Sequence, residues 1–303
     1  MAASATMHGT DVQTSIFKKL YPQEYLRRHL DNHVRDDGRA FTEPRNVSVA
    51  TGILSQANGS AVVRLGNATM VTAAVHAEVA EPLWERPSEG FIVPNAVLAP
   101  LCSPVYHTGP PEEDAQLLTH TLQRVLSVSN VLPRDALVIE PGVAVWSLNV
   151  DVLCVSANGS VLDAAVLAAV AALGNATLPV PVNTVDAAHC ICSAEKRTKL
   201  QLQGMPIVST FGIVDATYLL TDPVAFEESL TNALISVGIT DAPQDDPDAD
   251  VFYVQEAGHC MANEPQGKGA TLTHDTILEH CIRNARSRAT MLRTLVHESL
   301  KEV

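Results

Sequence analysis

Hydrophobic positions recur with helical spacing in several segments of the chain. Residues 112–129 and 273–300 each place their apolar side chains on one face, which is typical of helices that pack on a core. Residues 162–173 are rich in alanine and leucine, and residues 14–34 have helical character on both sides of Pro22, a residue that suits the first turn of a helix. We therefore predict helices over these segments, with the N-terminal one interrupted at Pro22.

β-rich runs bounded by turn residues indicate strands elsewhere. Residues 47–79 contain short runs separated by Asn-Gly and Gly-Asn turns, which is typical of adjacent antiparallel strands. Further strands are predicted in "ALVIEP", "VAVWSLNVDVLCV", "KLQLQGMPIVSTFGIVDATYLLTDP" and "DVFYVQEA". Residues 87–111 carry six prolines and are expected to form an irregular crossing, and residues 177–186 are expected to be a linker. Strands and helices alternate in two successive lobes, which predicts an α/β or α+β fold.

Composition narrows the class of protein. The chain has 303 residues, of which 46% are hydrophobic, so it can bury a sizeable core. Its net charge is -14 and 4% of its residues are aromatic, whereas proteins that bind nucleic acid unaided use basic grooves and stacking rings. The longest apolar run, residues 164–173, is too short to cross a membrane, and the N-terminal sequence does not resemble a signal peptide. We expect an intracellular protein with reduced cysteines and no membrane contact.

One junction has the pattern of an anion site. The strand in residues 151–156 runs into Asn158-Gly159-Ser160 and directly on into the alanine-rich helix. The first N–H groups of a helix lack partners within the helix, and the helix dipole is positive at that end. The pattern therefore predicts a strand, turn and helix that could cradle a phosphate, depending on the side chains beside the turn.

Other clusters are weaker candidates for chemistry. His189, Cys190 and Cys192 are soft ligands, but the chain has no CxxC pair with zinc spacing. Residues 241–250 concentrate aspartates without the central glycine and final glutamate of a calcium loop, so a solvated acidic loop is expected. The sequence also lacks a G-x-S-x-G elbow and a Walker loop. We expect no metal site and no cofactor.

A series of motifs in fixed order resembles a known family. The motifs are "P-x-E-Y-L-R-R-x-L" from Pro22, "RDDGR" at 35–39, "NGSA" at 58–61, "LGNAT" at 65–69, "IVPN" at 92–95, "GPP" at 109–111, "DVLCVSANGSVLDAA" at 151–165 and "LLTDP" at 219–223. In these motifs and their order the chain resembles the non-catalytic RNase PH-like ring subunits of the eukaryotic RNA exosome over roughly residues 22–290.

The resemblance implies a fold, partners and a location. The fold would be the RNase PH fold, with two β-α-β-type lobes at residues 46–180 and 205–303, an N-terminal helix and loop at residues 1–45, and a long C-terminal helix. The partners would be other RNase PH-like ring subunits and cap subunits, with RNA threaded through the ring. The resemblance also implies a place in the nucleus, the nucleolus and the cytoplasm. Active relatives degrade RNA by phosphorolysis, in which phosphate attacks the terminal phosphodiester.

The phosphate clamp that the resemblance implies is incomplete in this chain. Active relatives follow the strand with two glycines, a Thr or Ser and an arginine, whereas this chain has Asn158, Gly159, Ser160 and Val161. A valine cannot neutralise a phosphate. A second clamp arginine, expected just before the helix at 112, has no counterpart at residues 109–111. The chain is therefore expected to have no catalytic residue of its own.

Carboxylates of the family's site have counterparts here. Asp222 matches the first of them and Glu228 a later one, and Asp222 is expected to be an exposed turn residue before Pro223. Ser160 and Asp163 have the spacing of a capping box, so Asp163 is expected to reach back to the turn and to repel an incoming anion. The predicted vestigial phosphate site comprises Gly159, Ser160, Val161, Asp163, Asp222 and Glu228.

Two other functions stay open at this point. The chain could be a phosphorolytic 3'-to-5' exoribonuclease whose site is completed by a neighbouring subunit, with Arg86 as a candidate for the RNA path. It could also be a free RNA-binding module, which the net charge of -14 disfavours. The ring-subunit interpretation predicts apolar surface for neighbours and self-association of the isolated chain.

Overall fold

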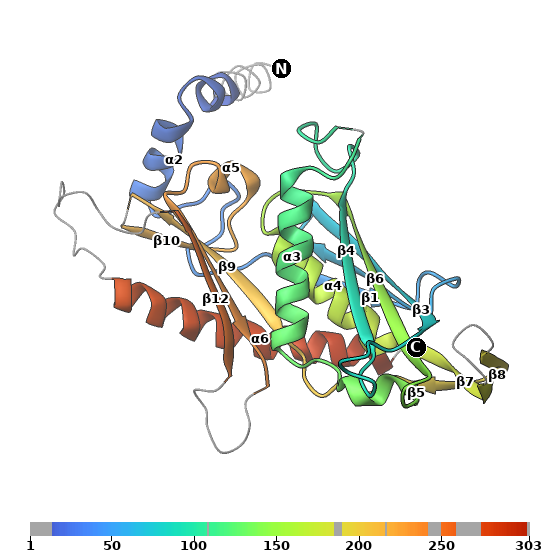
Figure 1. Cartoon of the computed structure of the whole chain (residues 1–303). Coiled ribbons are helices and arrows are strands. Elements are labelled where there is room, and N and C mark those ends of the chain that lie inside the picture. The colour runs from blue at the N-terminus through green and yellow to red at the C-terminus, as the bar shows by residue number, and fades with distance from the viewer. Residues whose placement is uncertain are drawn as a thin grey trace.

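Two β-sheets and the helices that cover them form the scaffold of the molecule (Figure 1). The structure is a computed structural model and describes residues 14–107, 109–184, 190–215, 217–241, 250–258 and 274–301. The first sheet contains β1 (Val47–Thr51), β2 (Gly59–Leu65), β3 (Thr69–Ala80), β4 (Phe91–Leu98), β5 (Val138–Glu140) and β6 (Ala144–Ser156). Its order is β1-β2-β3-β6-β4, with β5 paired to β6.

The first sheet follows the alternation of apolar and polar residues. β2 and β3 pair antiparallel with Val63 opposite Val71, and both side chains are buried. The turn between these strands contains Gly66 at φ +58°, a conformation that glycine adopts without strain. β4 pairs parallel to β6, so the prediction of an irregular crossing over residues 87–111 is wrong for its central part.

The second sheet follows in sequence. It contains β9 (Ile207–Val214), β10 (Tyr218–Thr221), β11 (Ala233–Ile239) and β12 (Val251–Gly258), in the order β10-β9-β11-β12. Every residue of β9 is buried, as expected of a central strand covered on both faces. A separate ribbon pairs β7 (Thr177–Thr184) with β8 (Cys190–Lys199), so the linker predicted over residues 177–186 is mostly strand.

The predicted helices are confirmed. Residues 14–20 are helical and α2 (Pro22–Asp31) begins at the proline. The others are α3 (Glu113–Val128), α4 (Val161–Asn175) and α6 (His274–Lys301). The single turn α5 (Ala225–Glu228) was not predicted. Figure 1 shows α6 running along one side of both sheets, where it contacts β1, β9 and β11. None of the helices in the described ranges is long and apolar enough to span a membrane.

Helix α4 joins the two sheets. It contacts β2 and β3 of the first sheet and β9 of the second, and twelve of its residues are buried. Gly59 in β2 permits a close approach of α4, because a Cβ at this position would lie 2.4 Å from the carbonyl oxygen of Ala172. The N-terminal end of α4 therefore lies where both lobes meet, and its neighbours come from distant parts of the sequence.

Candidate functional site

The turn before α4 packs against the second lobe. Gly159 has φ +80°, and a Cβ there would lie 2.4 Å from the carbonyl oxygen of Pro223 and 2.6 Å from the backbone nitrogen of Ala225. Ser160 also has a left-handed φ of +48° and makes no side-chain cap on the helix. Its hydroxyl instead donates to the carbonyl oxygen of Pro223 at 3.2 Å. The strand, turn and helix are present as predicted, but the connection between β10 and α5 covers the turn.

A carboxylate of the chain itself accepts the backbone N–H of Ser160 in this turn. The N–H of Ser160 donates to Oε1 of Glu228 at 2.7 Å. Burial raises the pKa of Glu228, and the nearby charges of Asp163 and Asp222 raise it further. The predicted capping box between Ser160 and Asp163 is therefore wrong. A carboxylate of the chain does lie beside the turn, but it belongs to Glu228 rather than to Asp163.

Asp163 points into the core instead. Its oxygens accept from the backbone N–H of Thr210 at 2.9 Å and from the Thr210 hydroxyl at 2.7 Å. Nη1 of Arg288, on α6, lies 3.2 Å from the same carboxylate. Burial raises the pKa of Asp163 to about 6, although the charge of Arg288 opposes this shift. The side chain thus ties α4 to β9 and α6.

Asp222 is the centre of a cluster of arginines. It is fully buried, at 0% exposure, so the prediction of an exposed turn residue is wrong. Its carboxylate accepts from the backbone N–H of Arg45 and from Nε, both at 2.9 Å, and from Nη2 at 2.6 Å. Arg39 and Arg288 lie 3.7 and 3.8 Å away. Burial alone would raise the pKa of Asp222, but these hydrogen bonds and positive charges hold it well below its usual range.

Arg45 connects three parts of the chain. Besides Asp222, its guanidinium donates to the hydroxyl of Thr69 at 3.1 Å and to the carbonyl oxygens of Asn158 at 2.8 Å and Gly159 at 3.1 Å. Each of its five side-chain N–H groups therefore has an acceptor. Arg35 donates to the carbonyl oxygens of Thr221 and Asp222 and forms a buried ion pair with Glu227.

Sequence reasoning missed Arg45 and Arg288. Arg288 could have been found from its position, because it lies three residues after Ala285 and four before Leu292 on the buried face of α6. A charged residue on such a face indicates a buried partner. Arg45 lies in a polar stretch before β1, where no sequence pattern distinguishes a buried arginine from an exposed one.

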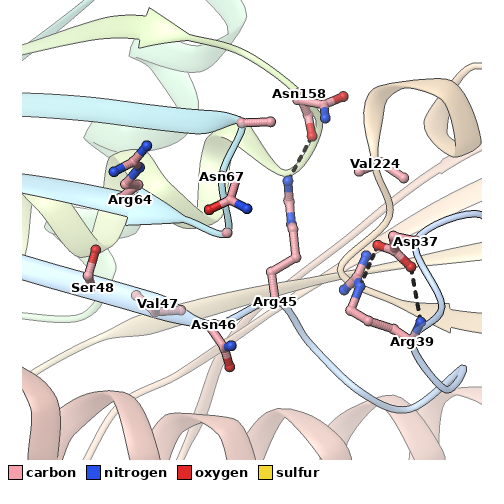
Figure 2. A pocket seen from close by; sticks show the side chains of 12 residues that line it. Asp37, Arg39, Arg45, Asn46, Val47, Ser48, Arg64, Asn67, Asn158 and Val224 are labelled. Atoms are coloured by element: carbon pink, nitrogen blue, oxygen red, sulfur yellow. Dashed lines mark hydrogen bonds and ion pairs between the residues drawn. The ribbon is translucent and has the colours of Figure 1, made fainter.

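Two arginines of the cluster, Arg39 and Arg45, also line a surface pocket of about 590 Å³ (Figure 2). Figure 2 shows the guanidinium of Arg45 reaching toward the carbonyl of Asn158, and Arg39 held by Asp37. Since Arg45 has no free donor, it cannot bind an added anion without losing these bonds. Arg64 is exposed on β2, but one exposed arginine does not make an anion site.

A second cavity, of about 290 Å³, lies at the start of α4. We call it the α4 cleft; α3, α4, β11 and β12 contribute to its wall. Among the described residues that line it, Asp114 and Glu228 are the charged ones, and none is a cation. This is the position at which the sequence pattern predicted a phosphate cradle, and its charge has the wrong sign for phosphate.

The remaining candidates lie outside this cluster. Arg86, in the connection between β3 and β4, pairs with Glu89 at 3.3 Å and has no hydrogen bond or ion pair to the cluster within the described ranges. In the part of the chain that the structure describes, no group of three or more His, Cys, Asp or Glu side chains is placed to hold a metal ion. His189 and most of the acidic stretch 241–250 lie outside the described residues.

Comparison with known proteins identifies the family. Residues 43–179 match the model of domain 1 of the RNase PH, 3' exoribonuclease family. The chain is 37% identical to exosome complex component rrp43 of Schizosaccharomyces pombe over 223 residues, which are 74% of this chain and 82% of that protein. This chain belongs to the RNase PH family. Exosome complex component Rrp42 of Methanothermobacter thermautotrophicus is 32% identical over 250 residues, covering 82% of this chain and 85% of that protein.

Solved structures agree with the RNase PH family. An exosome of Archaeoglobus fulgidus with RNA bound to its active site has a subunit with a TM-score of 0.74 and 28% identity, covering 93% of this chain and 98% of that one. Rice Rrp46, at 18% identity and a TM-score of 0.60, shares the fold. The expected RNase PH fold and the resemblance to exosome subunits are thus confirmed.

Proposed function

We propose that this chain is a non-catalytic subunit of an exosome, in which it forms part of a ring of RNase PH-like subunits around an RNA path and supports 3'-to-5' RNA processing and degradation. The similarity to exosome components in a yeast and in archaea supports the place in the complex. Its partners would be other ring subunits and cap subunits, with RNA threaded through the assembly. The nucleus, the nucleolus and the cytoplasm are the proposed locations.

One observation carries the non-catalytic role: the α4 cleft presents two carboxylates and no cation among its described lining residues. Phosphorolysis needs a site that attracts phosphate and stabilises negative charge as it develops. Here Val161 stands where the resemblance places an arginine, and Glu228 accepts the N–H of Ser160 that would otherwise face the anion. We interpret Gly159, Ser160, Val161, Asp163, Asp222 and Glu228 as the remains of a phosphate site.

The carboxylates that match the family's site now have structural roles. Asp222 is bound by Arg45 and Asp163 by Thr210, so neither has the open coordination that a catalytic metal would require. Both side chains hold the two lobes together, because their partners lie in other elements. Substitution of Asp222 is consequently unsuited to testing catalysis, since it is expected to destabilise the fold.

Exposed apolar side chains support assembly with neighbours. In the connection between β3 and β4, Trp84 is 97% exposed and Leu83 is 57% exposed. Buried tryptophans at interfaces often carry much of the binding energy, whereas an isolated protein gains nothing from exposing one. Arg86 follows on the same connection and stays the candidate for the RNA path.

Catalysis is tested by adding RNA and phosphate to the purified chain and to the complex that contains it. We expect the chain alone to release no nucleoside diphosphate. In the complex, Glu228→Gln in this chain should leave phosphorolysis per assembled complex unchanged, with Glu298→Gln on the exposed face of α6 as the matched control. Release by the chain alone would contradict the non-catalytic role. Release by the complex that Glu228→Gln abolishes and Glu298→Gln does not would favour the alternative, an exoribonuclease active at a subunit interface.

Assembly is tested separately. Affinity purification of the tagged chain from its own cells should recover other RNase PH-like proteins in fixed stoichiometry by mass spectrometry. Recovery of the chain alone, as a stable monomer, would contradict the place in the complex. Fluorescence microscopy of the same tagged chain tests the proposed locations.

A further inference from the structure

The wall of the α4 cleft is largely apolar. Leucines and a valine from several elements form it: Leu98, Leu117, Leu118, Val161, Leu162 and Leu234. The volume of about 290 Å³ falls just below the usual range of small-molecule pockets, roughly 300 to 1,000 Å³. A cavity of this size suits a single long side chain better than a nucleotide.

Glu228 lines this apolar cleft, and only one of its two carboxylate oxygens accepts a hydrogen bond from a described residue. Its Oε1 accepts the N–H of Ser160, while its Oε2 receives no hydrogen bond from any described residue. The side chain is half-buried, and a carboxylate that has lost part of its hydration is stabilised by a donor that replaces the lost water. Its raised pKa has the same origin, because burial disfavours the charged form. A ligand with N–H donors would therefore satisfy the free oxygen.

The rim of the cleft is uncovered. Leu117, which belongs to the wall, is 59% exposed, and Val105, next to the lining residue Tyr106, is 66% exposed. Apolar rims of this kind are typical of surfaces that bind another protein. The second acidic side chain, Asp114, is exposed and also lines the cleft, so the site is complementary to a cation.

We infer that the α4 cleft binds an arginine side chain of a neighbouring protein chain, with the guanidinium on Glu228 and the aliphatic stem against the leucines. Arginine combines an apolar stem with a planar, weakly hydrated cation that has several donors. It is also enriched in protein interfaces. This inference rests on the proposed function, because the neighbour would be another subunit of the complex. A site that the family resemblance assigns to phosphate would thus bind a cation in this chain.

The test uses the full isotopically labelled chain and three short blocked peptides with leucine on both sides of the central residue. The central residue is arginine, its neutral isostere citrulline, or norleucine. The backbone amide resonance of Ser160 reports binding, because this amide contacts Glu228. We expect the arginine peptide to bind about tenfold or more tightly than the citrulline peptide, the effect of one charge-assisted contact.

Two variants and a control make the result specific. Glu228→Gln keeps an acceptor for the N–H of Ser160 but removes the charge, so it should abolish the preference for arginine over citrulline. Leu117→Ser alters an exposed part of the wall that is not expected to affect folding, and should weaken all three peptides. Glu298→Gln lies on α6 outside both cavities and should change nothing.

Several results would overturn the inference. Equal affinity for the arginine and citrulline peptides, or an arginine preference that survives Glu228→Gln, would exclude a cation site at Glu228. Absence of any peptide binding, with inorganic phosphate also failing to shift the Ser160 amide, would contradict this inference but not the proposed function. A phosphate-induced shift of that amide would contradict the non-catalytic function as well.

Discussion

Replacing Asp222 with asparagine tests the arginine cluster at the junction of the lobes. Asp222 has φ +53°, a conformation that asparagine tolerates, so the substitution alters charge rather than turn geometry. The carboxylate accepts three hydrogen bonds from Arg45, two at 2.9 Å and one at 2.6 Å. An amide keeps one acceptor oxygen and directs its own N–H groups toward the arginine donors. Arg45, Arg39 and Arg288 then lose the carboxylate that neutralises them.

The expected loss of unfolding free energy is large. Removing one partner of a buried ion pair costs about 3 to 5 kcal/mol, and both Asp222 and Arg45 are buried. Urea unfolding with linear extrapolation measures the change. The matched control is Asp151→Asn, an exposed aspartate on β6, which is expected to change stability by at most about 0.5 kcal/mol. Equal midpoints for the two variants would refute the structural role of Asp222.

The same variant predicts a pH dependence. The pKa of Asp222 in the folded chain lies below its ordinary value of 3.8, so the charged carboxylate stabilises the fold above that pH. This contribution is lost as the pH falls toward the folded-state pKa. Wild-type protein should therefore lose stability below about pH 4 more steeply than Asp222→Asn. Parallel curves of unfolding free energy against pH for the two proteins in this range would contradict the lowered pKa of Asp222.

Three further predictions concern the turn, the surface and the core. Gly159→Ala should destabilise the chain by about 2 kcal/mol or more beyond the effect of the control Gly142→Ala. Gly142 has a similar φ of +78° but open space around it. Equal losses of stability in urea unfolding would exclude the close approach of Gly159 to Pro223. Trp84→Ala should leave stability within about 0.5 kcal/mol of wild type but weaken co-purification with the complex, and undiminished co-purification would remove Trp84 from the interface. The carboxyl carbon resonance of Asp163 should titrate with a midpoint of about 6. The stability contributed by this group then falls as the pH rises from about 4 to about 6, and a midpoint below 4 would contradict its burial.

Much of the fold could be predicted from local patterns. α3, α4 and α6 were predicted to within two residues at each end because their apolar positions repeat at helical spacing. β4 was missed because residues 87–111, within which it lies, carry six prolines. Pro94 is tolerated because β4 is the edge strand of its sheet, where an absent N–H costs little. The ribbon of β7 and β8 likewise has irregular register at Pro179 and Pro181.

The site was predictable in its residues but not in its contacts. The turn at Gly159 was identified from a short motif, and the carboxylates Asp222 and Glu228 from the family resemblance. Their partners lie far away in sequence, as with Arg45 and Asp222, and only the fold brings them together. The capping box failed because Ser160 has a left-handed φ, which directs its hydroxyl to Pro223 rather than to the helix. Local spacing cannot reveal such a backbone conformation.

Loss of phosphate binding at the start of α4 is tested most directly by isothermal titration calorimetry with inorganic phosphate. Wild-type chain is compared with the double variant Val161→Arg, Glu228→Gln, which restores a cation and removes the charge of the carboxylate on the N–H of Ser160. We predict no measurable phosphate binding to the wild type and measurable, salt-sensitive binding to the double variant. Saturable phosphate binding to the wild type, abolished by high salt, would contradict the non-catalytic role.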